Sequence, residues 1–290
     1  MGVQARLVIY AEKPERAAAA AERALELLRE LDGCLSHWSE ASELSRLVGR
    51  AGTGLVPVSP ELFEALEQAL AWSEVTRGAF DPTLGPLVSL WRESASTGRL
   101  PDAAALDRAR SLTGRERVRL DASGAVGLEP GTRLDLGGIG KGLACDRALD
   151  LLARAGLERS LVELGGDLAL GAPPPGRAGW IIAAGCSDPR LRLELAHCGV
   201  ATSGDREQHV VIDGVRYSHV IDPATGLGVT GRTCATVVAP SAAAADALAS
   251  AACSIDVEAL GVRGVRVYGR EARGAGDETR ARLALSAPPR

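Results

Sequence analysis

A glycine-rich turn, LDLGGIGKG, occupies residues 134–142 of the 290-residue chain. A predicted strand ends at this turn, and the apolar spacing of residues 141–155 predicts a helix after it. Glycine lets the backbone approach a ligand closely, and free amides at a helix N-terminus attract phosphate. The spacing matches neither a P-loop nor a dinucleotide-binding fingerprint, so a structural turn and a phosphate site are equal alternatives. Asp135 and Lys141 in the turn favour the site.

Short strands and helices alternate on both sides of this turn. Apolar patterns predict strands at 4–10, within 116–135, and at 159–164, 167–171, 178–184, 191–196, 208–213, 215–221, 233–239 and 262–269. They predict helices at 14–31, 59–72, from 101, 141–155 and 241–253. The mixture predicts an α+β fold of mostly antiparallel sheets packed with helices, in one domain over residues 1–270. The Gly/Arg/Pro-rich tail at 271–290 is expected to be loosely ordered.

The composition excludes several classes of protein. Hydrophobic residues make up 46% and charged residues 24%, which is typical of a soluble globular domain. The net charge of −4 indicates no electrostatic binding of nucleic acid or anionic lipid, and no stretch is long enough to span a membrane. No leader is visible, so the sequence as it stands indicates a cytoplasmic protein, or a periplasmic one if a leader was removed. The six cysteines show no paired spacing, so we expect reduced thiols.

One predicted helix carries a pair of oxygen ligands. Asp246 and Ser250 lie four residues apart, so both side chains project from one face. A carboxylate and a hydroxyl are suitable ligands for Mg²⁺, which binds phosphates while keeping some of its waters. The alternative, which is the commoner case for two such residues, is that Asp246 is a surface acid and Ser250 a small packing residue, with no metal bound.

A histidine lies where a predicted strand runs into a turn, in the sequence YSHVIDPATG at 217–226. His219 titrates near neutral pH and is a natural proton acceptor, although a histidine that only bonds the turn is the alternative. The remaining histidines have no comparable context and are interpreted as structural or exposed: His37, His197 and His209. Residues 165–167, Gly-Gly-Asp, predict a hairpin turn, and residues 201–205, ATSGD, predict a polar turn after a strand.

Together these segments resemble the ApbE family, the FAD:protein FMN transferases. The resemblance runs from Met1 to about residue 268, with every block in the family's order. The matching blocks are Met1-Gly2, SHW at 36–38, SELSRL at 42–47, GAFDPTLGPLVSLW at 78–91, the glycine turn with DRA at 146–148, and residues 164–167, 201–205, 218–223 and 245–251. Ser250 stands where the family usually has Thr, which keeps the hydroxyl, and Gly140 stands where it usually has Ala.

The resemblance implies an ApbE-like (T-fold-like) fold and Mg²⁺-dependent transfer of FMN from FAD to a Thr or Ser hydroxyl of an acceptor flavoprotein, with AMP released. It implies Mg²⁺ ligands at the Gly138 carbonyl, Asp246 and Ser250, and His219 as the base. Contacts to FAD are implied for Met1, Trp38, Ala79, Phe80, Asp81, Asp135, Lys141 and Ile221. Trp38 or Tyr217 is expected to stack on a ring of FAD. Hydrolysis of FAD to FMN and AMP, and flavin binding or delivery without turnover, are the alternatives.

Overall fold

A computed structural model describes residues 2–184, 190–205, 208–231 and 234–268. Met1 and the tail at 271–290, for which we made predictions, lie outside these ranges. The helices are α1 (Pro14–Leu35), α2 (Glu43–Val48), α3 (Pro60–Val75), α4 (Gly85–Thr97), α5 (Ala103–Arg110), α6 (Gly140–Arg154) and α7 (Ala242–Ala252). The strands are β1 (Ala5–Ile9), β2 (Leu55–Pro57), β3 (Val118–Leu120), β4 (Ala125–Leu128), β5 (Ser160–Leu164), β6 (Asp167–Leu170), β7 (Trp180–Ala183), β8 (Arg192–Leu195), β9 (Cys198–Gly204), β10 (His209–Ile212), β11 (Val215–Asp222), β12 (Leu227–Thr230), β13 (Cys234–Ala239) and β14 (Arg266–Tyr268).

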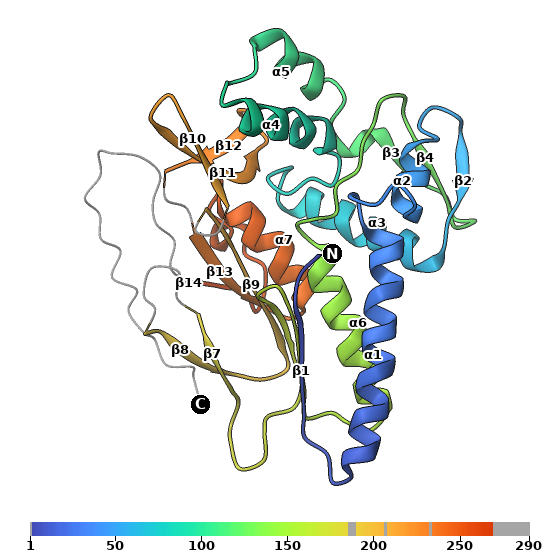
Figure 1. Ribbon diagram of the computed structural model, residues 1–290, viewed down its shortest axis with the longest axis vertical. Coiled ribbons are helices and arrows are strands. Elements are labelled where there is room, and N and C mark those ends of the chain that lie inside the picture. Colours follow the sequence, from blue (N-terminus) through green and yellow to red (C-terminus); the bar gives the residue numbers. More distant parts are fainter. Residues whose placement is uncertain (1, 185–189, 206–207, 232–233, 269–290) are drawn as a thin grey trace.

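The main sheet has six strands in the order β1-β5-β6-β9-β13-β14, and all neighbouring strands run antiparallel. Helices α1, α6 and α7 lie along one face, and the β7–β8 hairpin lies along the other (Figure 1). Successive side chains of a strand point to opposite faces of the sheet, so each strand packs against the helices on one face and the hairpin on the other. In β5, Val162 packs with α1 and α6, whereas Leu161 packs with Trp180 of the hairpin. The predicted α+β class, with antiparallel sheets and helices, is confirmed.

Two smaller sheets, β10-β11-β12 and β2-β4-β3, lie with α2 to α5 at one end of the main sheet (Figure 1). Helix α4 was not predicted from the sequence. It begins without a side-chain cap, and a Cβ on its first residue, Gly85, would lie 2.6 Å from the carbonyl oxygen of Arg133. The close approach of these two distant segments therefore positions α4, and a local sequence pattern does not contain that information. No helix in the described part of the chain is long and apolar enough to cross a membrane.

The alanine-rich helix α7 is buried almost all around and forms the centre of the molecule. Its first two amides, on Ala242 and Ala243, donate to the carboxylate of Asp146 in α6 at 2.8 and 2.9 Å. This acceptor satisfies amides that would otherwise have no partner at the helix start, and it fixes α7 against α6. Gly142 of α6 lies directly against the backbone of Ala242. The two helices meet at a distance that only a glycine allows.

Substituting Gly142 with Ala is expected to lower the free energy of unfolding by about 3 kcal/mol or more, because the new Cβ would overlap the Ala242 carbonyl. Gly140→Ala, two residues earlier, is the matched control. Its Cβ would meet only the Leu136 Cβ at 4.0 Å. Because Ala favours helix over Gly, that variant should be neutral or more stable by up to about 1 kcal/mol. Urea unfolding of both proteins measures the difference, and equal midpoints would contradict the packing argument.

Among the cysteines that the structure describes, one departs from expectation. Cys34, Cys145, Cys198 and Cys253 are free thiols, as predicted. Cys234 is disulfide-bonded, so the prediction of reduced thiols is wrong for this residue. The prediction relied on spacing along the chain, whereas disulfide formation depends on how close two Cα atoms come in the folded structure.

Candidate functional site

The start of α6 brings one lysine between two buried carboxylates. Lys141 Nζ lies 2.5 Å from Asp167 Oδ2, at the start of β6, and 3.3 Å from both carboxylate oxygens of Asp246 in α7. The amide of Gly142 donates to Asp246 Oδ2 at 3.2 Å. The glycine turn, the β5–β6 hairpin and α7 therefore meet at this lysine.

Two buried carboxylates share one ammonium in this group. Asp167 and Asp246 are each 2% exposed, and both face the same ammonium. Burial raises the pKa of Asp167 well above its ordinary value, and the nearby charge of Asp246 raises it further. Burial alone would lower the pKa of Lys141, but Asp246 and Asp167 outweigh it and raise that pKa. One ammonium cannot neutralise two carboxylates, so the group favours an added cation.

Gly138 lies against the Ser250 side chain. A Cβ at Gly138 would lie 2.8 Å from Ser250 Oγ and 3.2 Å from Phe80 Cε2, so any larger residue there would displace the Ser250 side chain. Ser250 Oγ lies 3.4 Å from Ser203 Oγ of β9, which fixes it beside the turn. Among the described residues there is no group of three or more His, Cys, Asp or Glu side chains that could hold a metal. Mg²⁺ commonly takes only one or two carboxylates and completes its shell with water and phosphate, so these residues fit it.

On its other side, the glycine turn contacts His37 and Arg92, which the sequence did not identify. Asp135 Oδ1 accepts from the amide of Gly137 at 2.7 Å and lies 3.2 Å from His37 Nδ1. Arg92 Nη2 lies 2.8 Å from His37 Nε2 and 3.8 Å from Asp135 Oδ2. Its guanidinium also covers the Trp38 ring, with Cζ 3.9 Å from the ring centroid. Interpreting His37 as structural or exposed missed this group, because 55 residues separate it from Arg92.

His219 projects from β11 into solvent, on the second sheet. Neighbouring protein atoms partly desolvate its ring and lower its pKa below the ordinary value. The hydrogen bond that the ring donates to the Gln208 carbonyl opposes this shift, and the charge of Lys141 adds to it. Nδ1 lies 3.3 Å from the Gln208 carbonyl oxygen. His219 is thus neutral near pH 7. The positive charge of Lys141 favours this neutral form.

Several predicted FAD contacts lie within the core. Tyr217 is 7% exposed and packs on Trp91, with ring centroids 5.2 Å apart, so it is not the open stacking surface that we expected. Ile221 is buried in the same cluster as both rings, and the Phe80 side chain is buried under the turn. The Asp81 carboxylate accepts from the amide and hydroxyl of Thr83 at 2.8 and 2.6 Å, which orders the loop before α4.

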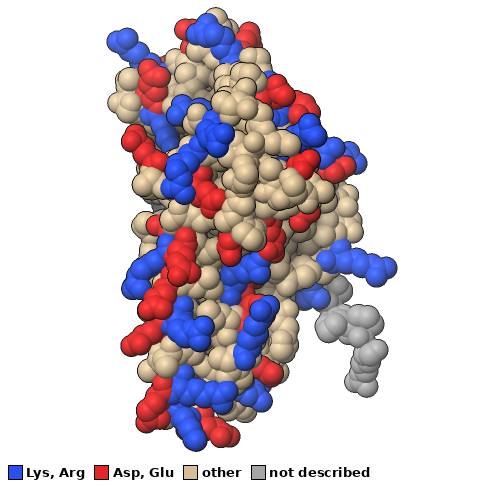
Figure 2. Space-filling view, turned by 90° about the vertical axis from the view of Figure 1, so that its right-hand side faces the viewer, with Lys and Arg blue, Asp and Glu red and all other residues tan. Residues whose placement is uncertain are grey.

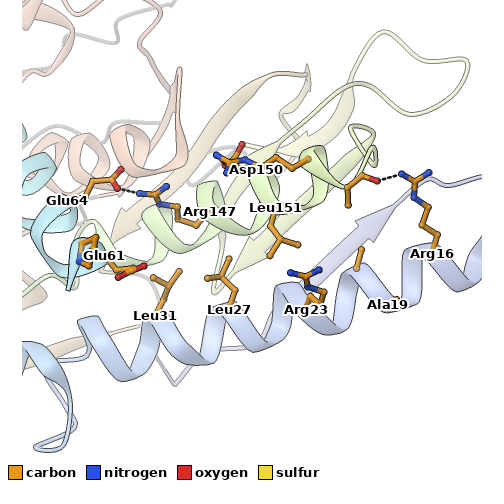
Figure 3. A pocket seen from close by; sticks show the side chains of 14 residues that line it. Arg16, Ala19, Arg23, Leu27, Leu31, Glu61, Glu64, Arg147, Asp150 and Leu151 are labelled. Atoms are coloured by element: carbon orange, nitrogen blue, oxygen red, sulfur yellow. Dashed lines mark hydrogen bonds and ion pairs between the residues drawn. The ribbon is translucent and has the colours of Figure 1, made fainter.

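A groove of about 770 Å³ lies elsewhere, between α1, α6 and the start of α3 (Figure 3). Leu27, Leu31 and Leu151 line it with apolar surface, and Arg147 pairs with Glu64 across it. None of the predicted site residues lines this groove. The side of the molecule that carries α1 shows acidic and basic side chains interspersed over its surface (Figure 2). The charges on this side therefore favour neither an anionic nor a cationic ligand.

Comparisons with known proteins identify the family of this chain. A model of the ApbE family matches residues 1–263. The chain belongs to the ApbE family. Among its relatives, the FAD:protein FMN transferase of Treponema pallidum is 34% identical over 275 residues, 87% of this chain and 75% of that protein. The FAD:protein FMN transferase of Vibrio cholerae is 34% identical over 232 residues, 77% of this chain and 70% of that protein.

Solved ApbE structures share the fold. The ApbE protein of Thermotoga maritima superposes with a TM-score of 0.77 at 34% identity, covering 87% of this chain and 83% of that one. The flavin transferase ApbE from Vibrio cholerae gives a TM-score of 0.76 at 27% identity, covering 93% of this chain and 94% of that one. In this ApbE chain Gly138 lies beside Ser250, and Lys141 pairs with Asp246 and Asp167. The sequence analysis placed Asp167 in a hairpin turn and in a block that resembles the family, but assigned it no role in the site.

Proposed function

We propose that this chain transfers FMN from FAD to a Ser or Thr hydroxyl of an acceptor protein and releases AMP, with Mg²⁺ bound. The observation that carries the proposal is the buried pair Asp167 and Asp246 around Lys141, directly under the glycine turn. Buried carboxylates next to a glycine turn, which a ligand can approach closely, suit a cation and a phosphate together. The relatives named FAD:protein FMN transferase support flavin as the substrate class.

The Gly138 carbonyl, Asp246 and Ser250 would hold Mg²⁺, which when bound offsets negative charge on the pyrophosphate. Lys141 adds a fixed positive charge beside the same phosphates. The absence of side chains at Gly137 and Gly138 would let phosphate oxygens approach the backbone of the turn closely. Catalysis of phosphoryl transfer consists largely of such positioning and charge stabilisation.

His219 acts as the base in this proposal. The acceptor hydroxyl oxygen forms a bond to the FMN phosphorus, the bond from that phosphorus to the AMP oxygen breaks, and the hydroxyl proton passes to His219. A neutral imidazole is required for this step, and the lowered pKa of His219 supplies it near pH 7. The exposed position of His219 also leaves it accessible to a side chain on a second protein.

The intact mass of a candidate acceptor tests the proposal directly. After incubation with this chain, FAD and Mg²⁺, we expect the acceptor to gain the mass of FMN less water and AMP to accumulate in equal amount. EDTA should abolish both changes. Release of FMN and AMP with no acceptor present would instead identify a hydrolase, and bound FAD that is never consumed would identify a flavin-binding protein.

A further inference from the structure

Trp38 is an exposed aromatic side chain that is nevertheless ordered by a contact. It is 70% exposed, the largest fraction among the exposed large hydrophobic residues of the described chain. The Arg92 guanidinium, from α4, covers the ring at 3.9 Å, which is the geometry of a cation–π contact. The His37 ring lies beside it, with centroids 5.0 Å apart. An indole that is ordered yet widely open to solvent suits the stacking of a second ring.

The same arginine is bonded to the glycine turn through His37. Arg92 Nη2 donates to His37 Nε2 at 2.8 Å, so the ring proton must be on Nδ1, which faces Asp135 Oδ1 at 3.2 Å. Asp135 in turn accepts from the Gly137 amide at 2.7 Å, one residue before Gly138. His37 and Asp135 are only 15% exposed, so these bonds are partly shielded from water. A continuous series of contacts therefore connects the indole to the turn.

We propose that Arg92 is a positioning residue, which holds the Trp38 ring and the glycine turn in one fixed relation so that a flavin or adenine ring and its phosphates bind together. The inference rests on the proposed FAD site. Without Arg92 the indole would gain rotamer freedom, and ordering it on binding would weaken the affinity for FAD. Because Arg92 contacts neither Lys141 nor His219, the chemical step is not affected.

The test measures the Kd for FAD by titration of flavin fluorescence, together with KM and kcat for transfer. Arg92→Gln is expected to raise Kd and KM roughly tenfold, with kcat within about twofold of the parent. Arg92→Lys should give an intermediate Kd, because one ammonium cannot both cover the indole and reach His37 as the planar fork does. Arg99→Gln removes an exposed arginine just after α4 and should leave all three constants unchanged.

A double-mutant cycle separates positioning through Trp38 from direct contact with FAD. In a Trp38→Leu background, Arg92→Gln should have little further effect on Kd.

The inference would be overturned if Arg92→Gln left the Kd for FAD unchanged. It would also be overturned if Arg92→Gln raised that Kd by the same factor in the parent and in the Trp38→Leu protein. If the parent binds FAD in an Arg92-dependent way but transfers no FMN, only the proposed function fails. If the parent transfers FMN and Arg92→Gln binds FAD normally, only the inference fails, and a parent that binds no FAD refutes both.

Discussion

Asp246→Asn is expected to reduce the rate of FMN transfer by about a thousandfold or more, because it removes the charged ligand of the proposed Mg²⁺ site. The substitution keeps the shape of the side chain and an oxygen to accept from the Gly142 amide. Lys141 also keeps its ion pair with Asp167, so the fold should be retained. The measurement is the single-turnover rate of acceptor flavinylation across a series of Mg²⁺ concentrations.

Asp150→Asn is the matched control for that experiment. Asp150 lies on α6, is half-exposed and pairs with Arg154 one turn later, a kind of contact that contributes little. Its rate and its Mg²⁺ dependence should equal those of the parent. Ser250→Thr, which restores the residue usual in the family, should also remain active, whereas Ser250→Ala should need more Mg²⁺. Full transfer by Asp246→Asn at ordinary Mg²⁺ would refute the metal assignment.

His219→Gln is expected to lower kcat by about a hundred- to ten-thousandfold while the KM for FAD stays nearly unchanged. The pH dependence adds a second signature. Partial burial lowers the pKa of His219 below its ordinary value of 6.5, so the neutral, proton-accepting form persists to a more acidic pH than in a free histidine. The kcat of the parent should fall as the pH decreases through this lowered pKa, and the variant should lack that decrease.

His209→Gln is a control on the neighbouring strand, because His209 is exposed and pairs with Ser218 in the β10–β11 register. Its pH profile should match that of the parent. A His219→Gln protein that keeps the acidic decrease in kcat would show that another group titrates, and one with normal kcat would remove His219 from the mechanism.

The sequence alone predicted the elements that have strong local signals. The helix at α1 follows from apolar residues three or four apart, and its buried residues Ala20, Ala24, Leu28, Leu31 and Leu35 keep that spacing. The Gly-Gly hairpin between β5 and β6 follows from residues that tolerate unusual backbone angles, since Gly165 and Gly166 both have positive φ. The turn before α6 follows from glycines that allow close approach, as at Gly138 beside Ser250. The order of the motifs along the chain indicated the ApbE family, and the match to the family confirms it. The roles assigned to individual site residues stay predictions.

The tertiary structure alone decided which charges meet. Lys141 pairs with Asp167, 26 residues away, and with Asp246, 105 residues away, and Arg92 reaches His37 across 55 residues. Periodicity and turn residues describe neighbours along the chain, whereas an ion pair depends on how separate helices and strands pack. The close contact of Gly142 with Ala242 sets that packing for α6 and α7. The sequence by itself determined a glycine turn followed by a helix, and only the packing placed two carboxylates around its lysine.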